Sequence, residues 1–478
     1  MQRNVLRIQK RIFRATREGD FRTVKNLQEL LSRSRGARLV AVRRVTQINQ
    51  GRNTAGIDGK TCTKDEEKER LVDEIRGIDW DTYRCSPVRR TRIPKPGKRE
   101  KRPLGIPIMK DRAMQAIIKS ALEPEWEAKF EQNSYGFRPG RRCMDAVRMI
   151  HDVLAMQKGK TGSAWILDAD IAKCFDMIDH EALLKKIPVF TSTIRRWLKA
   201  GAIEFGRFYK TRKGTPQGGV ISPLLANIAL DGMDRLFDAI NSKGRYCAPA
   251  ARKGKNKGII AIRYADDFVV IAPSRETLLE YVIPRLREFL KERGLSLSGA
   301  KTRIVHREEG FDFLGFHVQQ YNRKNHKICI VKPSKEKIQG LLSQVKDTLR
   351  RNRQATQAEI IDKLNQKIRG WAYYYRYCNA KETFAYVDFR VWEMLWRWCV
   401  RRHKQENKGK KWVMKRYFRH VGNRKWTFAD TADHALFLAS SMKCNVRDYA
   451  KVKGDASPFD PSLQDYWRKR HGKIPQEA

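Results

Sequence analysis

Two adjacent carboxylates, Asp266 and Asp267, interrupt a run of apolar and β-branched residues, IRYADDFVVI, that extends from Ile262 to Ile271. This pattern predicts a β-hairpin of buried strands whose turn carries both aspartates. Because two ionised carboxylates a few ångströms apart repel each other, burying them without a partner is unfavourable. The alternative interpretation is an ordinary Asp-Asp turn at a hairpin tip.

A hard divalent cation with oxygen ligands, such as Mg²⁺, keeps a pair of carboxylates ionised. Two such ions can clamp the attacking and leaving oxygens of a phosphoryl transfer, a reaction that needs carboxylates from more than one chain segment. A second segment is available, because the apolar strand predicted at 165–167 leads directly to Asp168 and Asp170. Asp170 is the candidate third ligand, whereas Asp168, Asp176 and Asp179 are of the kind that usually caps a helix.

The charge balance of the chain points to a polyanionic partner. Its 478 residues include 100 lysines and arginines against 53 acids, which gives a formal net charge of +47. Such an excess predicts binding to a long polyanion, RNA or DNA, rather than to a metabolite. A content of 41% hydrophobic and 10% aromatic residues indicates a folded, enzyme-like body and excludes a disordered basic tail.

The cysteines and the apolar runs bear on the compartment. Nine cysteines are scattered without a CxxC pair, so neither a zinc ribbon nor a disulfide scaffold is expected, and the chain is predicted to be intracellular and reduced. No apolar run of about 18 residues exists, so no membrane span is expected. The basic segment 1–17 could imitate a transit peptide, but it continues into a helical pattern and is predicted to be structural.

The pattern of elements is mixed. Helices are predicted up to about residue 80, and a basic strand pair with a turn at Pro94–Gly97 is predicted over 85–110. After residue 333 the chain becomes helical, aromatic and basic. Between these parts we expect helices at 111–160, 220–237 and 275–293, a loop at 214–219, and strands at 311–316 and 328–331.

Four further side chains are candidates for substrate contacts. Phe175 follows Asp170 by five residues and could reject a ribose 2′-hydroxyl by a clash, or it could be a core aromatic. Gln217 lies in a Pro-Gln-Gly-Gly loop whose glycines let backbone approach a base or phosphate. Lys95 and Arg102 could bind a triphosphate through charge-assisted hydrogen bonds, or could form the solvated face of a basic hairpin.

Eight segments of the chain, taken in order, resemble those of group II intron-encoded reverse transcriptase/maturases of bacterial type. The resemblance covers essentially the whole chain, and the order of the segments makes it far more specific than YADD alone. The segments are AGIDG (55–59), RIPKPGKREKRPLGIP (92–107), NSYGFRPGR (133–141), LDADIAKCFDMIDH (167–180), GTPQGGVISPLLANI (214–228), RYADDFVV (263–270), RGLSLSGAKT (293–302) and EGFDFLGF (309–316).

This resemblance implies a fold and a division into domains. The implied fold is α+β, a right-hand polymerase with fingers and palm around an antiparallel sheet, followed by a helical thumb or maturase domain and a small basic C-terminal domain. The expected boundaries are 1–80 for an N-terminal extension and the start of the fingers, 81–330 for the fingers and palm, 331–400 for the thumb, and 401–478 for a basic, DNA-binding-like domain.

The resemblance also implies roles for individual residues. Three aspartates, Asp170, Asp266 and Asp267, would hold two Mg²⁺ ions, and the backbone carbonyl of Ile171 would assist. The remaining residues match positions that contact the nucleotide or the primer: Lys95 and Arg102 for the triphosphate, Phe175 for the sugar, Gln217 for the nascent base pair, Lys301 as a proposed proton donor to pyrophosphate, and Phe313, Leu314 and Gly315 as the primer grip.

The implied activity is RNA-directed DNA synthesis, with a second role in binding the intron RNA to assist splicing and intron mobility. The expected partners are group II intron RNA, an RNA template with a DNA primer, target DNA and dNTPs, in a bacterial cytoplasm and without a membrane. Two alternatives remain: a domesticated host reverse transcriptase in defence or repair, and a binding-only splicing maturase. Retention of all three carboxylates argues against the second.

One departure concerns the zinc-dependent endonuclease into which many relatives continue. The segment Asp465–Arg470 resembles the lead-in to that domain, but Cys444 and His471 alone cannot build a four-ligand site. We therefore expect no zinc and no second-strand nicking by this chain. A natural absence and a shortened protein are equally compatible with the sequence.

Overall fold

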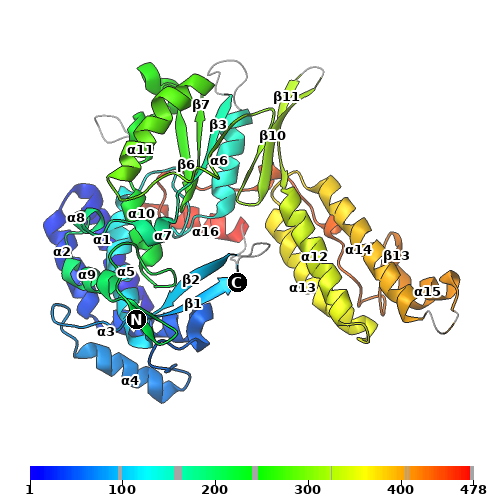
Figure 1. The fold of residues 1–478 in the computed structure, drawn as a ribbon, viewed down its shortest axis with the longest axis horizontal. Coiled ribbons are helices and arrows are strands. Elements are labelled where there is room, and N and C mark those ends of the chain that lie inside the picture. The colour runs from blue at the N-terminus through cyan, green and yellow to red at the C-terminus, as the bar shows by residue number, and fades with distance from the viewer. Residues whose placement is uncertain are drawn as a thin grey trace. The chain divides into compact units, whose positions relative to one another are not determined.

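The computed structural model describes residues 1–94, 100–155, 164–239, 246–323, 326–403, 406 and 408–473. They form two compact units, each assembled from separate stretches of the chain (Figure 1). Unit 1 comprises Met1–Ala146, Thr161–Ile304 and Val452–Ala478, and unit 2 comprises Val147–Lys160 and Val305–Lys451. Residues 452–473, the described end of the expected 401–478 domain, are grouped with unit 1, and the expected domain boundaries stay a prediction.

The N-terminal part of unit 1 is helical, as predicted. Side-chain caps define two helix starts: the amide of Thr23 donates to Asp20 over 3.0 Å, and the amide of Ala37 donates to Ser34 over 3.1 Å. The long helix α5 receives this group on its apolar side, in the same core. The helices are α1 (Gln2–Glu18), α2 (Phe21–Arg33), α3 (Arg35–Arg43), α4 (Asp65–Arg76) and α5 (Met109–Lys129).

A four-stranded sheet in the order β2-β1-β4-β5 confirms the predicted basic strand pair. Strands β1 and β2 are antiparallel, while β1 and β4 are parallel, with Val88 opposite Ala202. The predicted turn at Pro94–Gly97 and its Lys95 fall largely on residues 95–99, which lie outside the described residues. The strands are β1 (Val88–Pro94), β2 (Lys101–Ile106), β4 (Ala202–Glu204) and β5 (Arg207–Tyr209).

A second four-stranded sheet, in the order β6-β7-β3-β8, forms the centre of unit 1. Its middle strands are largely apolar and buried, with Ile166, Phe268 and Ile271 all at 0% exposure. Figure 1 shows α10 and α11 beside this sheet, and their apolar residues share its core. The strands are β3 (Trp165–Asp170), β6 (Ile260–Tyr264), β7 (Asp267–Ala272) and β8 (Arg303–His306).

The helices around this sheet correct one prediction. A single helix was expected over 220–237, but α10 ends at Leu230 and a separate 3₁₀ turn follows at Asp234–Phe237. Gly232, whose φ of +109° is not helical, separates these two elements. The others are α7 (Cys174–Met177), α8 (His180–Lys185), α9 (Thr191–Lys199), α10 (Ser222–Leu230) and α11 (Ile283–Lys291), which a π-helical turn at Thr277–Val282 precedes. Helix α6 (Cys143–Ala155) begins in unit 1 and continues in unit 2.

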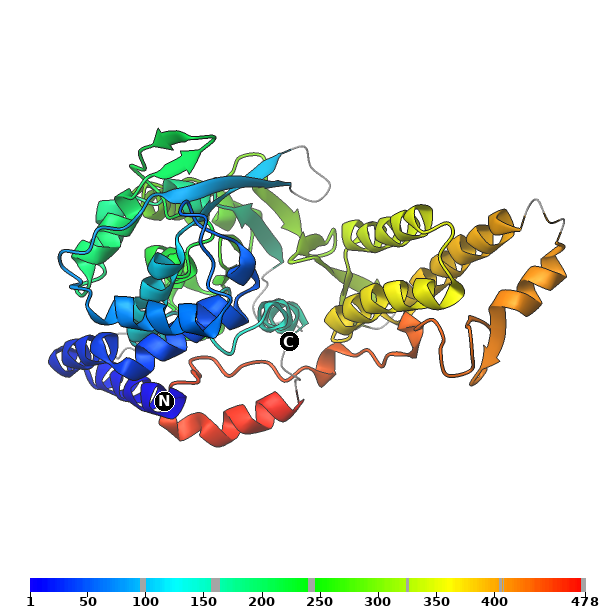
Figure 2. The ribbon, with the colours of Figure 1, turned by 90° about the horizontal axis from the view of Figure 1, so that it is seen from below.

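The C-terminal segment returns to unit 1 and is held there by buried polar contacts (Figure 2). Arg470, on α16 (Gln464–Lys473), donates to both carboxylate oxygens of Asp145 over 2.8 and 2.9 Å. Both side chains are buried, at 4% and 0% exposure. The amide of Val452 also donates to Asp145, over 2.7 Å. We call residues 452–473 the clasp segment.

Unit 2 confirms the expected strands near 311–331 and the helical region after 333. Three antiparallel strands precede the helices, and a small hairpin follows them. The elements are β9 (Phe311–Phe313), β10 (Phe316–Arg323), β11 (His326–Pro333), α12 (Lys335–Arg351), α13 (Gln357–Tyr375), α14 (Lys381–Arg402), α15 (Lys410–Tyr417), β12 (Phe418–Val421) and β13 (Arg424–Phe428).

The α+β class, the antiparallel central sheet and the helical C-terminal part therefore match the fold that was predicted. All nine cysteines are free thiols, consistent with the absence of a CxxC pair. Among the described residues, no helix has the length and apolar character that crossing a membrane requires.

Candidate active site

The central sheet brings the three predicted carboxylates to one edge. Asp170 ends β3 and Asp267 begins β7, and the antiparallel register places these two residues directly opposite each other. Asp266 occupies the turn between β6 and β7, next to Asp267. The sequence pattern predicted the hairpin and its turn, and the strand pairing adds Asp170 from a segment about 100 residues away.

The three carboxylates at this edge are partly removed from water and repel one another. Desolvation by the surrounding protein, followed by the charges of Asp266 and Asp170, raises the pKa of Asp267 to about 7. Desolvation likewise raises the pKa of Asp266, and the charge of Asp170 adds to that effect. Asp267 still reaches solvent, whereas Asp170 is 9% exposed. Three carboxylates so placed favour any species that brings positive charge to them.

Lys301 supplies one positive charge already. Its ammonium group forms an ion pair with Oδ2 of Asp170, and this hydrogen bond raises the pKa of Lys301. The segment before Lys301 lies along the end of β3, because the amide of Ser298 donates to the Asp170 carbonyl over 2.8 Å. The amide of Ala172 donates to Ser296 over 2.9 Å, so neither of these bonds uses the carbonyl of Ile171.

The donor chemistry at this edge fits Mg²⁺. The available ligands are carboxylate oxygens and the Ile171 carbonyl, which a hard cation prefers over nitrogen or sulfur. The raised pKa values of Asp266 and Asp267 show that added positive charge would be stabilising there. Within the described residues, however, no group of three or more His, Cys, Asp or Glu side chains already has the arrangement of a metal cage.

A buried arginine supports the turn that carries Asp266. Nη1 of Arg263, on β6, donates to the carbonyl of Ala265 over 3.1 Å and to Oδ1 of Asn227 over 3.0 Å. Asn227 in turn donates to the carbonyl of Gly136 over 2.8 Å. Ala265 has φ of +57°, a conformation that is strained for a residue with a side chain. The arginine and the asparagine thus hold a strained turn in place.

Gly136 is required at this contact because the backbones meet. A Cβ atom on Gly136 would lie 2.3 Å from the amide nitrogen of Ala265. The amide of Tyr135 also donates to the carbonyl of Arg263 over 2.9 Å, so the segment 133–136 runs along β6. Our sequence reasoning did not assign a role to Arg263 or Asn227. The signal was present, since a charged residue inside a run of apolar strand residues needs buried partners.

An Asn227→Ala protein is expected to lose more activity than stability. The substitution removes one acceptor from Arg263 and frees the Gly136 carbonyl, which lowers the free energy of unfolding by about 1–3 kcal/mol. Because the Ala265 turn loses support, we expect kcat of the DNA synthesis that the family resemblance implies to fall about tenfold or more, with little change in KM for dNTP. Steady-state kinetics beside thermal unfolding checks this. An unchanged kcat would show that the turn holds itself.

Phe175 and the Gln217 loop lie together near the end of β3. Phe175, on α7, is partly buried, and its ring meets that of Phe137 edge-on with centroids 6.3 Å apart. The amide of Thr215 donates to the carbonyl of Phe175 over 2.7 Å. The carbonyl of Gln217 accepts from the amide of Gly105 over 2.6 Å, which attaches the loop to β2. The structure therefore brings the candidate sugar gate and the candidate base-pair residue onto neighbouring segments.

The candidate triphosphate residues divide between described and undescribed parts. Arg102 is exposed on β2, where it pairs with Ile93, and its charge lowers the pKa of Asp266 against the effect of burial. The positive charge of Arg102 therefore acts on the carboxylate edge. Lys95 lies outside the described residues, and its role stays a prediction.

The residues predicted to grip the primer form the turn between β9 and β10, within unit 2. Leu314 and Gly315 have φ of +51° and +83°. Two hydroxyl groups of α13 hold this turn: Tyr374 donates to the Leu314 carbonyl over 3.3 Å, and Tyr375 donates to the Gly315 carbonyl over 3.1 Å. Phe313, before the turn, is buried at 3% exposure.

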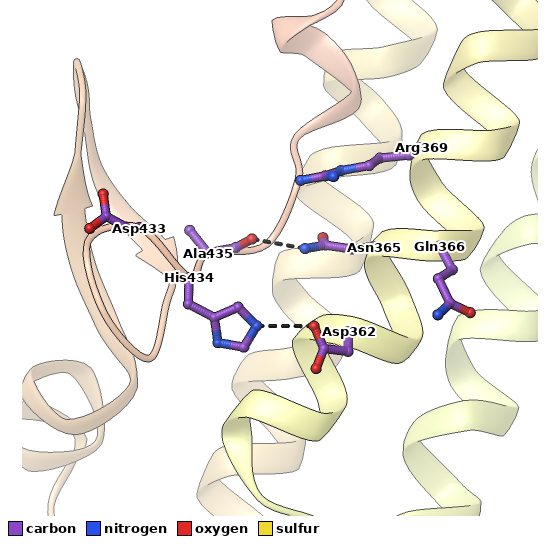
Figure 3. Close-up of a pocket in the computed structure, with 7 residues that line it drawn as sticks. All are labelled: Asp362, Asn365, Gln366, Arg369, Asp433, His434 and Ala435. Atoms are coloured by element: carbon purple, nitrogen blue, oxygen red, sulfur yellow. Dashed lines mark hydrogen bonds and ion pairs between the residues drawn. The ribbon is translucent and has the colours of Figure 1, made fainter.

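A separate pocket of about 480 Å³ lies in unit 2, on the side of α13 (Figure 3). Most of its polar groups attach the segment 434–437 to the helix. Nε2 of His434 lies 3.1 Å from Oδ1 of Asp362, and Asn365 donates to the Ala435 carbonyl over 3.0 Å. Arg369 extends along the rim, with its guanidinium 5.3 Å from the ring of Phe437. The pocket therefore lies where the segment 434–437 packs against α13, and its role is mainly structural.

Comparison with known proteins gives matches along most of the chain. Residues 93–318 match the family model described as reverse transcriptase (RNA-dependent DNA polymerase), and residues 1–75 match the N-terminal domain of reverse transcriptase. Residues 338–418 match the group II intron maturase-specific domain. All three predicted metal ligands fall within the first of these matches.

Curated relatives agree with these models. Protein YkfC of Escherichia coli is 33% identical over 304 residues, which cover 58% of this chain and 79% of YkfC. The group II intron-encoded protein LtrA of Lactococcus lactis is 28% identical over 420 residues, 71% of this chain and 69% of LtrA. Maturase-like protein 1 of Euglena gracilis is 25% identical over 395 residues, 81% and 78% of the two chains. With the three carboxylates at one sheet edge inside the reverse transcriptase match, the chain belongs to the reverse transcriptase/maturase family of group II introns.

Proposed function

We propose that this chain is an active RNA-directed DNA polymerase. The observation that carries the proposal is the cross-strand pairing of Asp170 with Asp267, with Asp266 in the adjoining turn. A relic that only binds RNA has no need to keep Asp266 and Asp267 beside Asp170, because burial and the neighbouring charge raise the pKa of both residues and make their ionised forms unfavourable unless a cation joins them. The reaction is attack of a primer 3′-hydroxyl on the α-phosphate of a dNTP.

The residues of the site have distinct proposed tasks. Asp170, Asp266 and Asp267 would hold Mg²⁺, with the Ile171 carbonyl as a further ligand. When bound, Mg²⁺ supplies positive charge that offsets the negative charge on the transferred phosphoryl group. Arg102, and Lys95 by resemblance, would hold the triphosphate through charge-assisted hydrogen bonds. Lys301 is our candidate donor to pyrophosphate by resemblance, and its bond to Asp170, which raises the pKa of Lys301, keeps it protonated.

Phe175 and Gln217 would define the nucleotide pocket. The two segments are joined by the hydrogen bond from Thr215 to the Phe175 carbonyl. A partly buried ring on one segment can exclude a 2′-hydroxyl, while the exposed backbone at Gly218 leaves room for a base on the other. The turn Phe313–Gly315 in unit 2, held by Tyr374 and Tyr375, is our candidate for the primer grip.

A Phe175→Ala protein is expected to incorporate ribonucleotides. Removing the ring relieves the clash with a 2′-hydroxyl, so discrimination between dNTP and NTP, as the ratio of kcat/KM values, should fall about tenfold or more. Competing single-nucleotide incorporation measures this ratio. Phe137→Ala is the matched control, since that ring touches Phe175 from the side. If discrimination stays intact and only Tm falls, Phe175 is a core aromatic.

A second role, in holding folded intron RNA, is proposed for unit 2. Its maturase-domain match covers α12 to α15, where several aromatic side chains remain exposed on basic helices. Tyr373 is 36% exposed with the guanidinium of Arg376 at 3.7 Å from its ring, and Phe389 is 57% exposed. Exposed rings beside arginines suit stacking on unpaired RNA bases and contact with phosphates. The expected partner is the group II intron RNA.

Primer extension on a heteropolymeric RNA template, with Mg²⁺ and dNTPs, tests the polymerase proposal directly. Long cDNA supports it. No extension, together with tight and salt-sensitive binding of intron RNA, would instead identify a binding-only maturase. A domesticated host reverse transcriptase shares every residue of the site, and the presence or absence of intron RNA sequence around the gene separates that alternative. Target DNA and a cytoplasmic location remain part of the proposal.

A further inference from the structure

The hairpin formed by β4 and β5 carries an aromatic side chain at its tip. Glu204 pairs with Arg207, so the turn has only two residues, Phe205 and Gly206. Both have positive φ, +51° and +77°. The ring of Phe205 is 93% exposed, the highest exposure among the large apolar side chains of the described residues. In Figure 2 the hairpin stands out at the upper left of unit 1, in green.

Phenylalanine is a poor choice for this turn. A two-residue hairpin turn with positive φ at both positions favours Asn-Gly or Asp-Gly, because a short polar side chain tolerates the left-handed conformation. The bulky side chain at Phe205 is strained there, and an almost fully exposed ring gains nothing from burial. Residues that break a local rule without a gain in the fold commonly serve a function.

The surroundings of the tip are basic and aromatic. The nine residues 205–213 include three aromatics and four cations but no acid, and eight of the nine are exposed. The acid beside the tip, Glu204, is held by Arg92 over 2.6 Å. The four cations form no ion pair with any described residue and leave their charge available for a polyanion: Arg207, Lys210, Arg212 and Lys213.

The base of the hairpin is rigid. The hydroxyl of Thr211 donates to the Leu198 carbonyl over 2.8 Å and accepts from the amide of Gly201 over 3.1 Å. The ring of Phe208 lies against Gly201, where a Cβ atom would come within 2.4 Å of it. A strained tip on an anchored base is held ready for contact and does not need to be ordered first.

The sheet relates the hairpin to the nucleotide pocket. At one edge, β2 receives the Gln217 loop through the bond to Gly105, and β5 forms the opposite edge. With strands spaced by about 4.8 Å, the two edges are roughly 14 Å apart. The hairpin therefore lies across the sheet from the strand that holds the Gln217 loop, at a separation that a few nucleotides can span.

We propose that the β4–β5 hairpin binds the unpaired RNA template ahead of the polymerase site. Phe205 stacks on a template base, and the four cations of 205–213 contact the neighbouring phosphates. An unpaired strand is the occupant because base faces are open to an aromatic ring only outside a duplex. This inference rests on the proposed polymerase function, since it assigns the strand as template.

A Phe205→Asn protein tests the proposal, because the change is expected to improve the turn while removing the ring. We expect an unchanged or higher Tm by differential scanning fluorimetry. Binding is measured by fluorescence anisotropy without dNTPs, on a DNA primer annealed to an RNA template that is either blunt or extended by a 5′ overhang of about ten nucleotides, enough to span the two sheet edges. The variant should lose about tenfold in affinity for the overhang duplex and nothing for the blunt one.

Two further proteins sharpen this test. Phe205→Trp keeps a stacking ring and should restore the affinity for the overhang. Arg207→Ala with Lys210→Ala should lower the slope of log Kd against log salt by about 1.4 on the overhang duplex. Equal binding by Phe205→Asn and the unchanged protein, or equal losses on both duplexes, would overturn the inference. Because no synthesis is required, a protein without polymerase activity can still pass, which separates this result from the proposed function.

Discussion

An Asp266→Asn protein is expected to lose primer extension by at least about 100-fold while it keeps its affinity for RNA. The substitution removes a charged oxygen ligand from the carboxylate edge and leaves the basic surfaces unchanged. The fold should not weaken. Burial, and then the charge of Asp170, raises the pKa of Asp266 in the fold, so its ionised form is destabilising above the pKa of the unfolded chain. A neutral amide removes both the cost of burying a charge and the repulsion from Asp170.

Three measurements on the same preparation separate the possible outcomes. They are cDNA yield with Mg²⁺ and dNTPs, template affinity, and Tm. Asp168→Asn is the matched control, because Asp168 is a carboxylate on β3 of the same sheet, but its Oδ2 pairs with Nε of Arg303 at 2.9 Å. We expect that control to remain active. Full activity of Asp266→Asn would refute the proposed metal ligation, whereas a shared loss in both variants would indicate damage to β3 and β7.

The largest effect on stability is expected for Asp145→Asn. This change leaves the buried guanidinium of Arg470 without its carboxylate, and breaking a buried ion pair lowers the free energy of unfolding by about 3–5 kcal/mol. The amide of Val452 donates to the same Asp145 carboxylate. Both contacts of the clasp segment are therefore weakened by the change, and the segment should detach as a whole. Urea unfolding followed by tryptophan fluorescence measures the loss, since Trp467 is buried within the clasp segment at 5% exposure.

Arg468→Ala is the control for that prediction. Arg468 lies on the same helix and pairs with Asp465, but both side chains are about four-fifths exposed, at 80% and 78%. Water screens such a pair, so its removal should leave the unfolding curve in place. If Asp145→Asn unfolds at the same urea concentration as the unchanged protein, the clasp contributes nothing to the stability of unit 1.

Some of this architecture could be predicted from residue patterns alone. The apolar run around Asp266 is long and rich in β-branched residues, and the run before Asp170 is short, but both predicted buried strands with carboxylates at their ends. Their mutual register could not be obtained this way, because it depends on which strands pair. The family resemblance supplied that step, and the pairing of Asp170 with Asp267 agrees with it.

Other features depend on long-range contacts that no local pattern records. The charged Arg263 is unexpected inside a buried strand. It is explained by its hydrogen bonds to the side chain of Asn227 and to the carbonyl of Ala265. The end of α10 at Leu230 depends on a glycine that a continuous apolar pattern conceals. The expected absence of zinc and of second-strand nicking stays a prediction.

The assembly of unit 1 from three stretches has a consequence for biosynthesis. Asp145 leaves the ribosome early, but its partner Arg470 is separated from it by 325 residues. At about 5–20 residues per second, the carboxylate waits roughly 16–65 s for its counter-ion. By the end of that interval both earlier stretches of unit 1 have been translated, while the Asp145 carboxylate still lacks its counter-ion. Synthesis of the clasp segment and stability of unit 1 are therefore coupled, so that chains without the clasp segment remain open to proteolysis.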